Sequence, residues 1–405
     1  MSESTTPVLG NLFTPEFIND PYPTYRLIRE TNPFLKFPGG NDWIAVRYED
    51  CAAVLRDKRF GIDNDRRMKL AIGDDYMSIP AYASLSRTML FSDPPAHTRL
   101  RKLVVRAFDA RSIEKLRGQI RRIAADLVDE MENSSSGDLM TAFARQLPIE
   151  VICEMLGIPK EDRHRFTAVD ENAGRILDPT PMTPEELAEV NRNTLEGAAY
   201  FDDLCERRRQ EPTDDLLTAM VQSETEHGKL TREELNANIS LLFGAGHETT
   251  VNLIGNGLLA LYRNRDQLKL LQDDPSLIPN AIEELLRYDS SVQLSGRTAL
   301  EDAEICGHRI ESGAQIVTII AAANRDPEMY ENPESLDVTR QNIRPLSFGG
   351  GIHHCLGAQL ARIEGTEAFS ELLGRLPRLE LDDVVNAKWK PTITLRGLIE
   401  LPAHW

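Results

Sequence analysis

The sequence predicts a mainly α-helical protein with small β-sheets. Most of the chain carries helical periodicity with polar or acidic starts, and only short β-rich stretches interrupt it. By length the 405 residues could form about two or three average domains, but no Pro-, Gly- or Ser-rich or charged linker divides them. We therefore expect a single domain over residues 1–405.

The expected strands are short and lie in three places along the chain. The segment 41–50 contains the apolar, β-rich core Trp43-Ile-Ala-Val-Arg-Tyr48 and predicts a strand. Residues 304–318 have a hairpin pattern broken at Gly307 and Gly313, and a short strand pair is expected near 392–401.

The longest expected helix begins at the capping box Thr231-Arg-Glu-Glu234 and runs to about residue 264. At about 1.5 Å per residue it would span roughly 50 Å. Its middle reads Phe243-Gly-Ala-Gly-His-Glu-Thr-Thr250. Each glycine inside a helix costs roughly 1 kcal/mol relative to alanine, so these glycines require a reason.

This segment suits oxygen chemistry. The small Ala245 and Gly246 would leave room over a flat cofactor, Thr249 can hydrogen-bond dioxygen or water, and Glu248 could relay protons. The alternative is a glycine-weakened helix whose threonines bond back to carbonyls one turn earlier. His247 is interpreted as an ordinary packed or surface histidine.

A second motif, Phe348-Gly-Gly-Gly-Ile-His-His-Cys-Leu-Gly357, places one cysteine before an expected helix over 356–376. A helix N-terminus lowers the pKa of a thiol, and the thiolate is the form that binds metals. Gly349, Gly351 and Gly357 would allow tight turns or a close approach to a flat ligand. Cys355 has no second cysteine or histidine pair at zinc spacing, so it suits a metal held mostly by a macrocycle. An inert buried thiol is the alternative.

The order Phe-Gly-x-Gly-x-His-x-Cys-x-Gly resembles the haem-ligand loop of the cytochrome P-450 family, the haem-thiolate monooxygenases. The segment around Ala245 and Gly246 also resembles that family's Ala-Gly-x-Asp/Glu-Thr signature. The resemblance covers nearly the whole chain. It implies the P-450 fold, with haem b (iron protoporphyrin IX) between the long helix and the Cys355 loop. It makes Cys355 the axial ligand of the iron, Phe348, Gly349 and Gly357 parts of the loop that binds haem, and Glu248 and Thr249 the catalytic pair.

The resemblance also assigns residues to the haem propionates and to structural support. Propionates need cationic partners, and the family pattern selects His97, Arg101, Arg297 and His353. Glu284-Leu-Leu-Arg287 is either a surface ion pair or the family's buried Glu-x-x-Arg pair, with Arg340 as a third member. We expect these three to be structural.

For the substrate pocket, the resemblance selects segments 60–92, 241–245, 291–295 and 392–395. Their side chains are mostly apolar, including Leu242, Val292, Leu294 and Ile393. The expected reaction inserts one oxygen atom of O2 into a hydrophobic small molecule of secondary metabolism, by hydroxylation or epoxidation. A peroxygenase driven by H2O2 and a non-catalytic haem-based ligand-binding protein are the alternatives, and Glu248 with Thr249 disfavours both.

Charge and cysteine usage limit the partners and the compartment. A net charge of −18 argues against nucleic acid. The resemblance implies electrons from a separate ferredoxin and ferredoxin reductase. One local run of basic residues could bind an acidic ferredoxin, or it could be only a solvated helix face. It consists of Arg99, Arg101, Lys102, Arg106, Arg111, Lys115, Arg117, Arg121 and Arg122.

Five widely spaced cysteines favour a reducing compartment, and no run approaches the roughly 18 apolar residues of a membrane span. The start of the chain has neither the basic region nor the apolar core of a signal peptide. We expect a cytoplasmic monomer without a membrane anchor.

Overall fold

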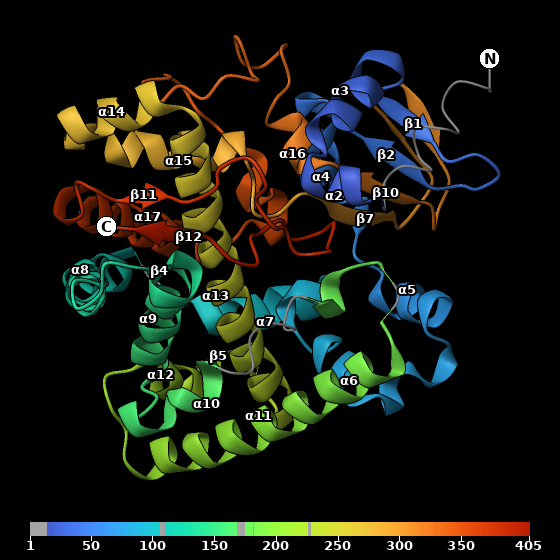
Figure 1. Ribbon diagram of the computed structural model, residues 1–405. Helices are drawn as coiled ribbons and strands as arrows, with labels where there is room; N and C mark the ends of the chain where they lie inside the picture. Colours follow the sequence, from blue (N-terminus) through green and yellow to red (C-terminus); the bar gives the residue numbers. More distant parts are fainter. Residues whose placement is uncertain (1–13, 106–107, 109, 168–174, 181, 226–227) are drawn as a thin grey trace.

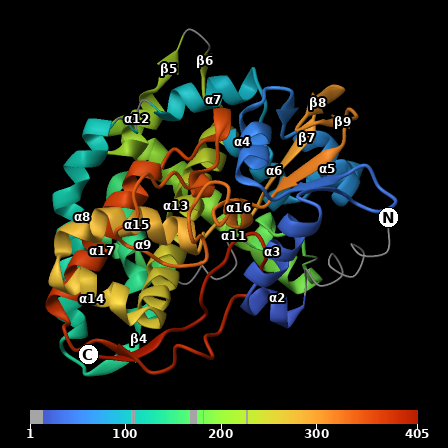
Figure 2. The same cartoon turned by 90° about the horizontal axis from the view of Figure 1, so that it is seen from above.

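The computed structural model describes residues 14–105, 108, 110–167, 175–180, 182–225 and 228–405. The protein is mainly α-helical with small sheets, as predicted. Figures 1 and 2 show helices α8, α9, α14, α15 and α17 on one side, the sheet with α2, α3 and α4 on the other, and α13 between them. None of the helices in the described ranges combines the length and the hydropathy of a membrane span.

The helices have the following bounds: α2 Pro15–Asn19, α3 Tyr22–Thr31, α4 Tyr48–Arg56, α5 Asn64–Ala71, α6 Pro80–Leu85, α7 Ala96–Val105, α8 Ala110–Met131, α9 Gln146–Leu156, α10 His164–Thr167, α11 Pro184–Gln210, α12 Leu216–Gln222, α13 Arg232–Arg263, α14 Arg265–Asp273, α15 Ile278–Tyr288, α16 Ile320–Ala323 and α17 Ala358–Arg375.

The largest sheet has the order β1-β2-β10-β7-β3. Its strands are β1 Phe34–Lys36, β2 Trp43–Ala45, β10 Gln315–Thr318, β7 Ser295–Ala299 and β3 Phe60–Gly61, and only the β2–β10 pair is parallel. A three-stranded sheet joins β11 Glu380–Leu381, β12 Pro402–His404 and β4 Ser136–Asp138. Two further pairs are β5 Glu224–Thr225 with β6 Gly228–Lys229, and β8 Ala303–Ile305 with β9 His308–Ile310.

The strand predictions are partly confirmed. The strand expected over 41–50 is only Trp43–Ala45, because α4 begins at Tyr48, whose N–H donates to the Asp326 carboxylate at 2.8 Å. The hairpin is β8–β9, which turns at Cys306 and Gly307, both with positive φ. β10 leaves this hairpin and pairs with β2 and β7 instead.

The strand pair expected near 392–401 is reduced to isolated bridges. In the described chain this segment makes two isolated bridges, one between Leu395 and Val292 and one between Leu398 and Trp389. The physical reason is competition from a distant partner. Lys390 N donates to Gly397 O at 2.9 Å and Ile399 N to Lys388 O at 2.8 Å, but Arg396 N donates to Ser291 O at 2.8 Å, so the local pairing does not extend into strands.

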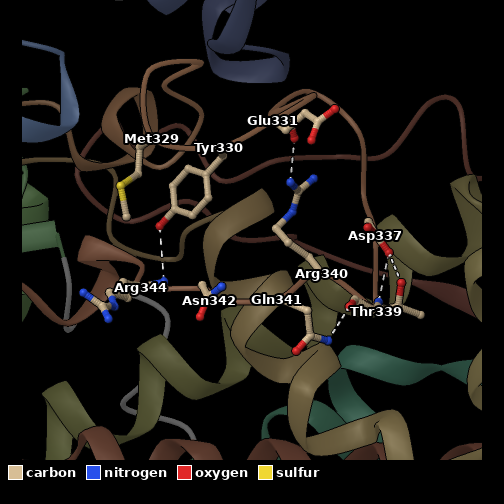
Figure 3. Close-up of a pocket in the computed structure, with 9 residues that line it drawn as sticks. All are labelled: Met329, Tyr330, Glu331, Asp337, Thr339, Arg340, Gln341, Asn342 and Arg344. Carbon is tan, nitrogen blue, oxygen red and sulfur yellow. Dashed lines mark hydrogen bonds between the residues drawn. The ribbon is translucent and has the colours of Figure 1, made fainter.

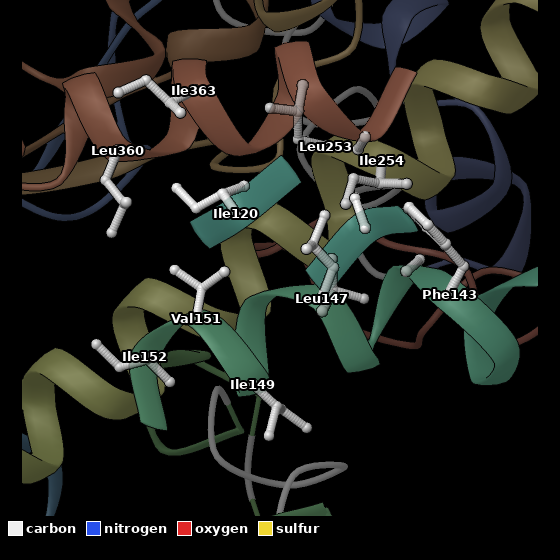
Figure 4. Packing of buried hydrophobic residues seen from close by; sticks show 14 of the residues in the cluster. Ile120, Phe143, Leu147, Ile149, Val151, Ile152, Leu253, Ile254, Leu360 and Ile363 are labelled. Atoms are coloured by element: carbon white, nitrogen blue, oxygen red, sulfur yellow. The ribbon is translucent and has the colours of Figure 1, made fainter. Parts of the chain in front are cut away.

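The long central helix is confirmed. α13 spans Arg232–Arg263, and Thr231 caps it with both bonds of the capping box: its hydroxyl accepts from Glu234 N, and its N–H donates to the Glu234 carboxylate. Figure 4 shows how the helix is held: Leu253 and Ile254 pack with Leu147 of α9 and Ile363 of α17 in the main core. The burial of these apolar side chains fixes the middle of α13 relative to α17.

Candidate functional site

The Cys355 loop folds tightly onto α4. The backbone N–H of Cys355 donates to Phe348 O at 2.8 Å and closes the loop. Gly351 has φ +65°, and a Cβ built there would lie 2.4 Å from Leu55 O, so a larger residue would push α4 away. The close approach predicted for Gly351 is therefore to protein backbone. At Gly357 a Cβ would meet no atom within 4 Å, so this position borders open space.

Cys355 keeps an exposed surface, although the protein around it desolvates its thiol. Desolvation by the surrounding protein raises its pKa, and this outweighs the lowering by the Gly357 N–H and by Arg101 and Arg362. The predicted lowering by a helix N-terminus is therefore wrong in sign, because α17 begins only at Ala358. A bound metal ion would reverse the balance, since coordination removes the thiol proton.

Four predicted propionate-binding residues lie around this loop. The imidazole rings of His97 and His353 are 4.4 Å apart between centroids. Arg101 donates to His354 O at 2.6 Å, while Arg297 donates to Ser295 Oγ at 2.9 Å and to Gly296 O at 2.8 Å. Burial, and then the neighbouring cations, lower the pKa of His353 to about 3. Burial also lowers the pKa of Arg297 to about 10.

Asp93 acts on His97 and Arg297 through its charge, but none of the four groups forms an ion pair within the described ranges. Among the described residues, both ring nitrogens of His97 and the Nε2 of His353 are buried without hydrogen-bond partners. A buried polar group without a partner is costly, so such atoms indicate an absent ligand. Imidazole and guanidinium donors that surround an exposed cysteine match a flat cofactor with an iron atom and two carboxylates. The residues present therefore fit haem.

The middle of α13 leaves a small face uncovered. Ala245 is exposed, and Leu241 and Thr249, one turn away on either side, are half-buried, although most of the helix is buried. A Cβ at Gly244 would meet no atom within 4 Å, and one at Gly246 would make only an ordinary contact with Ile152 at 3.8 Å. The protein's own packing therefore does not require these glycines, which is consistent with space reserved for a ligand.

The hydroxyl of Thr249 donates to Ala245 O at 2.9 Å. This is the back-bond of the alternative interpretation, and it leaves the oxygen free to accept a hydrogen bond. Ser291 Oγ donates to Thr249 O at 2.9 Å, while the adjacent Ser290 donates to Ser347 Oγ at 2.6 Å. Residues 290–291 thus connect the centre of α13 with the start of the Cys355 loop.

Glu248 is buried, and its carboxylate lies 3.1 Å from the Nζ of Lys390. Sequence reasoning missed Lys390. The lysine is 142 positions away, in a segment without a motif, so no sequence signal pointed to the pair. His247 is a packed histidine, as interpreted from the sequence: it is buried, and its Nε2 lies 3.2 Å from Arg145 O.

The residues predicted to be structural form a separate buried network. Arg287 and Glu284 are fully buried and joined by two hydrogen bonds of 2.7 and 2.8 Å. Arg340 Nε lies 3.1 Å from the Glu284 carboxylate, and Arg287 also donates to three backbone carbonyls between 324 and 335. The network fastens α15 to the segment before the Cys355 loop.

Next to this network is a hollow of about 630 Å³. Figure 3 shows Tyr330 and Arg340 in its wall, with the Tyr330 hydroxyl accepting from Arg344 N at 3.3 Å. The wall is polar and contains none of the residues around Cys355. We therefore assign this hollow to the structural network.

Three of the four predicted pocket residues lie near one another. Val292 forms a bridge with Leu395, and Leu294 and Ile393 are half-buried against one apolar cluster. Leu242 belongs to the larger core around α13 instead. The structure thus brings together the segments after α15 and before the C-terminus, but it does not join Leu242 to them.

The basic run follows α7 and α8, and part of it is engaged in ion pairs. Arg99 pairs with Glu234, while Arg117 and Arg121 both reach Glu367 on α17, at 2.9 and 2.8 Å. The run therefore lies against the helix that follows Cys355. Arg106 and the side chain of Arg111 lie outside the described residues.

Comparisons with known proteins agree with this arrangement. The sequence model of the cytochrome P-450 family matches residues 58–387. The polyketide biosynthesis cytochrome P-450 PksS of Bacillus subtilis is 42% identical over 405 residues, covering 96% of each chain. The vitamin D(3) 25-hydroxylase of Pseudonocardia autotrophica is 41% identical over 400 residues, covering 97% of this chain and 95% of its own.

The likeness extends to solved structures. P450BioI, in complex with acyl carrier protein ligated to hexadec-9Z-enoic acid, superimposes with a TM-score of 0.89 and 36% identity, over 96% of this chain and 99% of that chain. PksS superimposes with a TM-score of 0.86. The chain therefore belongs to the cytochrome P-450 family, and it is a monooxygenase of that family.

Proposed function

We propose that this monooxygenase hydroxylates or epoxidises a hydrophobic small molecule, using haem b bound through Cys355 and electrons from a separate ferredoxin and ferredoxin reductase. The observation that carries the proposal is the exposed surface of Cys355 beside buried imidazole nitrogens without partners. When bound, the haem iron supplies the activation of dioxygen.

Each part of the site has a role in this proposal. Cys355 donates its thiolate to the iron, and the loop formed by Phe348, Gly349 and Gly357 holds it in place. Ala245 and Gly246 leave room on the facing helix. His97, Arg101, Arg297 and His353 would hold the two propionates, which would give their nitrogens anionic acceptors.

Glu248 and Thr249 control protons. The Thr249 hydroxyl, which already donates to Ala245 O, accepts a hydrogen bond from a water and holds it in the site. Glu248 passes protons from the protein interior toward that water, and Lys390 Nζ at 3.1 Å orients its carboxylate. The Glu284–Arg287–Arg340 network has no part in the chemistry and supports the fold of the loop.

An apolar substrate is supported by Val292, Leu294 and Ile393, and Leu242, which packs in the main core, stays a proposed fourth pocket residue. Relatives named for polyketide biosynthesis and for vitamin D(3) 25-hydroxylation make a secondary metabolite the expected class. All five cysteines are unpaired, which suits the reducing cytoplasm. A single-domain monomer remains our expectation, and its mass in solution would test it.

The carbon monoxide complex of the reduced protein tests the proposal. A thiolate-ligated haem gives a strongly red-shifted absorption band, which Cys355→Ala should abolish. Cys306→Ala is the matched control, because Cys306 is another partly exposed cysteine. A Cys355→Ala protein that retained the band would remove Cys355 as the ligand.

Product formation distinguishes the three functions considered. A monooxygenase forms product with NADPH, a surrogate ferredoxin and its reductase, whereas a peroxygenase forms it with H2O2 alone. A ligand-binding protein forms none under either condition. We expect product only with the electron-transfer proteins.

A further inference from the structure

Arg67 in α5 is a half-buried arginine for which the described part of the chain supplies no ion-pair partner. Its guanidinium makes no hydrogen bond or ion pair with any residue in the described ranges. Only the negative charge of Asp63 stabilises its protonated form. Burial lowers its pKa below the ordinary arginine value. Its Nη2 lies 4.0 Å from the position that a Cβ would take at Gly296 of β7.

Two arginines that are more deeply buried than Arg67 have acceptors. Arg163 binds the carboxylates of Glu150 and Glu154, and Arg396 binds that of Asp289. The carboxylate of Asp63, one turn earlier, acts on Arg67 through its charge but forms no ion pair with it, and Asp93 accepts the backbone N–H groups of Ile62 and Asp63. A partly desolvated cation without an acceptor indicates an anionic ligand.

Arg67 lies on the side of β7 that belongs to the proposed substrate pocket. Gly296 stands directly opposite Val317 in the β7–β10 register, so the two residues share a face of the sheet. Val317 packs against the same apolar cluster as Leu294 and Ile393. Arg297, the next residue after Gly296, points to the opposite face because side chains alternate along a strand. The positive charge of Arg67 still contributes to the lowered pKa of Arg297, so the two guanidinium groups lie within electrostatic range of each other, and the haem content of the Arg67 variant distinguishes a propionate from a substrate carboxylate.

We propose that Arg67 binds the carboxylate of an amphipathic acid whose apolar body lies along Leu294, Val317 and Ile393. The inference rests on the proposed function and narrows its substrate class from hydrophobic molecules to hydrophobic acids. The guanidinium forms two parallel N–H···O bonds with the carboxylate, and the apolar side chains of the cluster exclude water from the chain of the acid.

The test compares an acid with its neutral ester in the haem-loaded enzyme. Binding of dodecanoic acid and methyl dodecanoate is measured by the shift of the haem absorption band and by equilibrium dialysis. We expect the acid to bind about tenfold more tightly or better, because a hydrogen bond to a charged group contributes that much. Arg67→Gln should remove this preference and leave the affinity for the ester unchanged. Arg67→Lys should keep part of it.

Arg66→Gln is the matched control. Arg66 is the adjacent residue of α5, but it is exposed and its guanidinium packs against Gly313. This variant should keep the wild-type preference for the acid.

Three results would overturn the inference: equal affinities for acid and ester in the wild type, an unchanged preference in Arg67→Gln, or loss of haem from Arg67→Gln. The last result would place a propionate at Arg67. Failure of the proposed function appears separately, as a reduced carbon monoxide spectrum without the thiolate band.

Discussion

Glu248 and Thr249 are adjacent residues in the middle of α13, and each has a defined partner. The Thr249 hydroxyl donates to a carbonyl of its own helix, and Glu248 pairs with a lysine from the C-terminal segment. In the proposed function Thr249→Ala and Glu248→Gln still bind haem and substrate but deliver protons poorly. We therefore expect more peroxide per electron pair and less product, measured as the ratio of the two to NADPH consumed.

Thr249→Ser is the matched control for that experiment, because it retains the hydroxyl. It should keep most of the wild-type ratio. Wild-type coupling in both Thr249→Ala and Glu248→Gln would show that the protons take another path.

Lys390→Met should destabilise the protein, because it leaves the buried Glu248 carboxylate without its cation. Removing one member of a buried ion pair typically costs about 3–5 kcal/mol. Lys388→Met is the control: this lysine pairs with Glu400 at 2.7 Å, but both side chains are exposed, and such pairs contribute about 0–1 kcal/mol. Urea unfolding of the holoprotein measures both, and equal losses would contradict a buried role for Lys390.

At the scale of elements, Glu284 and Arg287 join α15 to the segment that leads into the Cys355 loop. Both side chains are fully buried, and Arg340 adds a second cation to Glu284. Glu284→Ala and Arg287→Ala should each cost about 3–5 kcal/mol and yield little folded holoprotein. Lys269→Ala is the control, since Lys269 and Asp273 form an exposed pair on α14. Haem content after purification gives the comparison, and normal content in the α15 variants would refute the structural role.

A second element contact predicts a dependence on pH. Glu364 of α17 is buried against α13 beside Thr250, its Oε2 has no partner in the described structure, and burial raises its pKa well above the ordinary value. Above the unfolded pKa of about 4.3 the folded state therefore binds the extra proton, and stability falls as the pH rises. Glu364→Gln removes this cost.

The stability advantage of Glu364→Gln over wild type should grow by about 1.4 kcal/mol per pH unit above about pH 4.3, until the folded carboxyl ionises. Urea unfolding between pH 5 and 8 would measure it. Glu371→Gln, at a partly exposed position of the same helix, should show no such trend. A constant difference between Glu364→Gln and wild type would contradict the raised pKa.

The elements that the sequence predicted well are those fixed by local interactions. The capping box at Thr231 and Glu234 lies within one turn, so the start of α13 could be predicted from four residues. The segment 392–401 could be predicted only in part, because besides local bonds to residues 388–390 it pairs with Ser291 and Gln293, about a hundred residues earlier. The β-propensity of a segment depends on its own residues, whereas its strand pairing depends on which distant segment of backbone lies beside it.

At the scale of the whole molecule, the candidate site also contains residues that a local pattern predicts and residues that only tertiary contacts reveal. Cys355 and the Glu248–Thr249 pair belong to contiguous motifs, so residue order alone was sufficient to select them. Lys390 and Arg67 gain their significance from tertiary contacts with Glu248 and Gly296, and no local pattern marks them. The pKa of Cys355 was predicted with the wrong sign because desolvation by distant segments outweighs the local helix end.

The charge distribution of the whole molecule leads to the last prediction. A chain with a net charge of −18 carries a basic run along α7 and α8, against the helix that follows Cys355. An acidic ferredoxin steered to this run should reduce the haem more slowly as salt rises, given a Debye length of about 8–10 Å at ordinary ionic strength. Arg106→Glu and Arg111→Glu should each slow reduction at low salt.

Arg117 and Arg121 are unsuitable for charge reversal, because their reversal would also break the ion pairs with Glu367. Lys36→Glu, in β1 on the sheet side of the molecule (Figure 1), makes the same change in net charge and should have little effect. Stopped-flow reduction under carbon monoxide measures these rates. Reduction independent of salt, with all three variants equal to wild type, would leave the run as a solvated helix face.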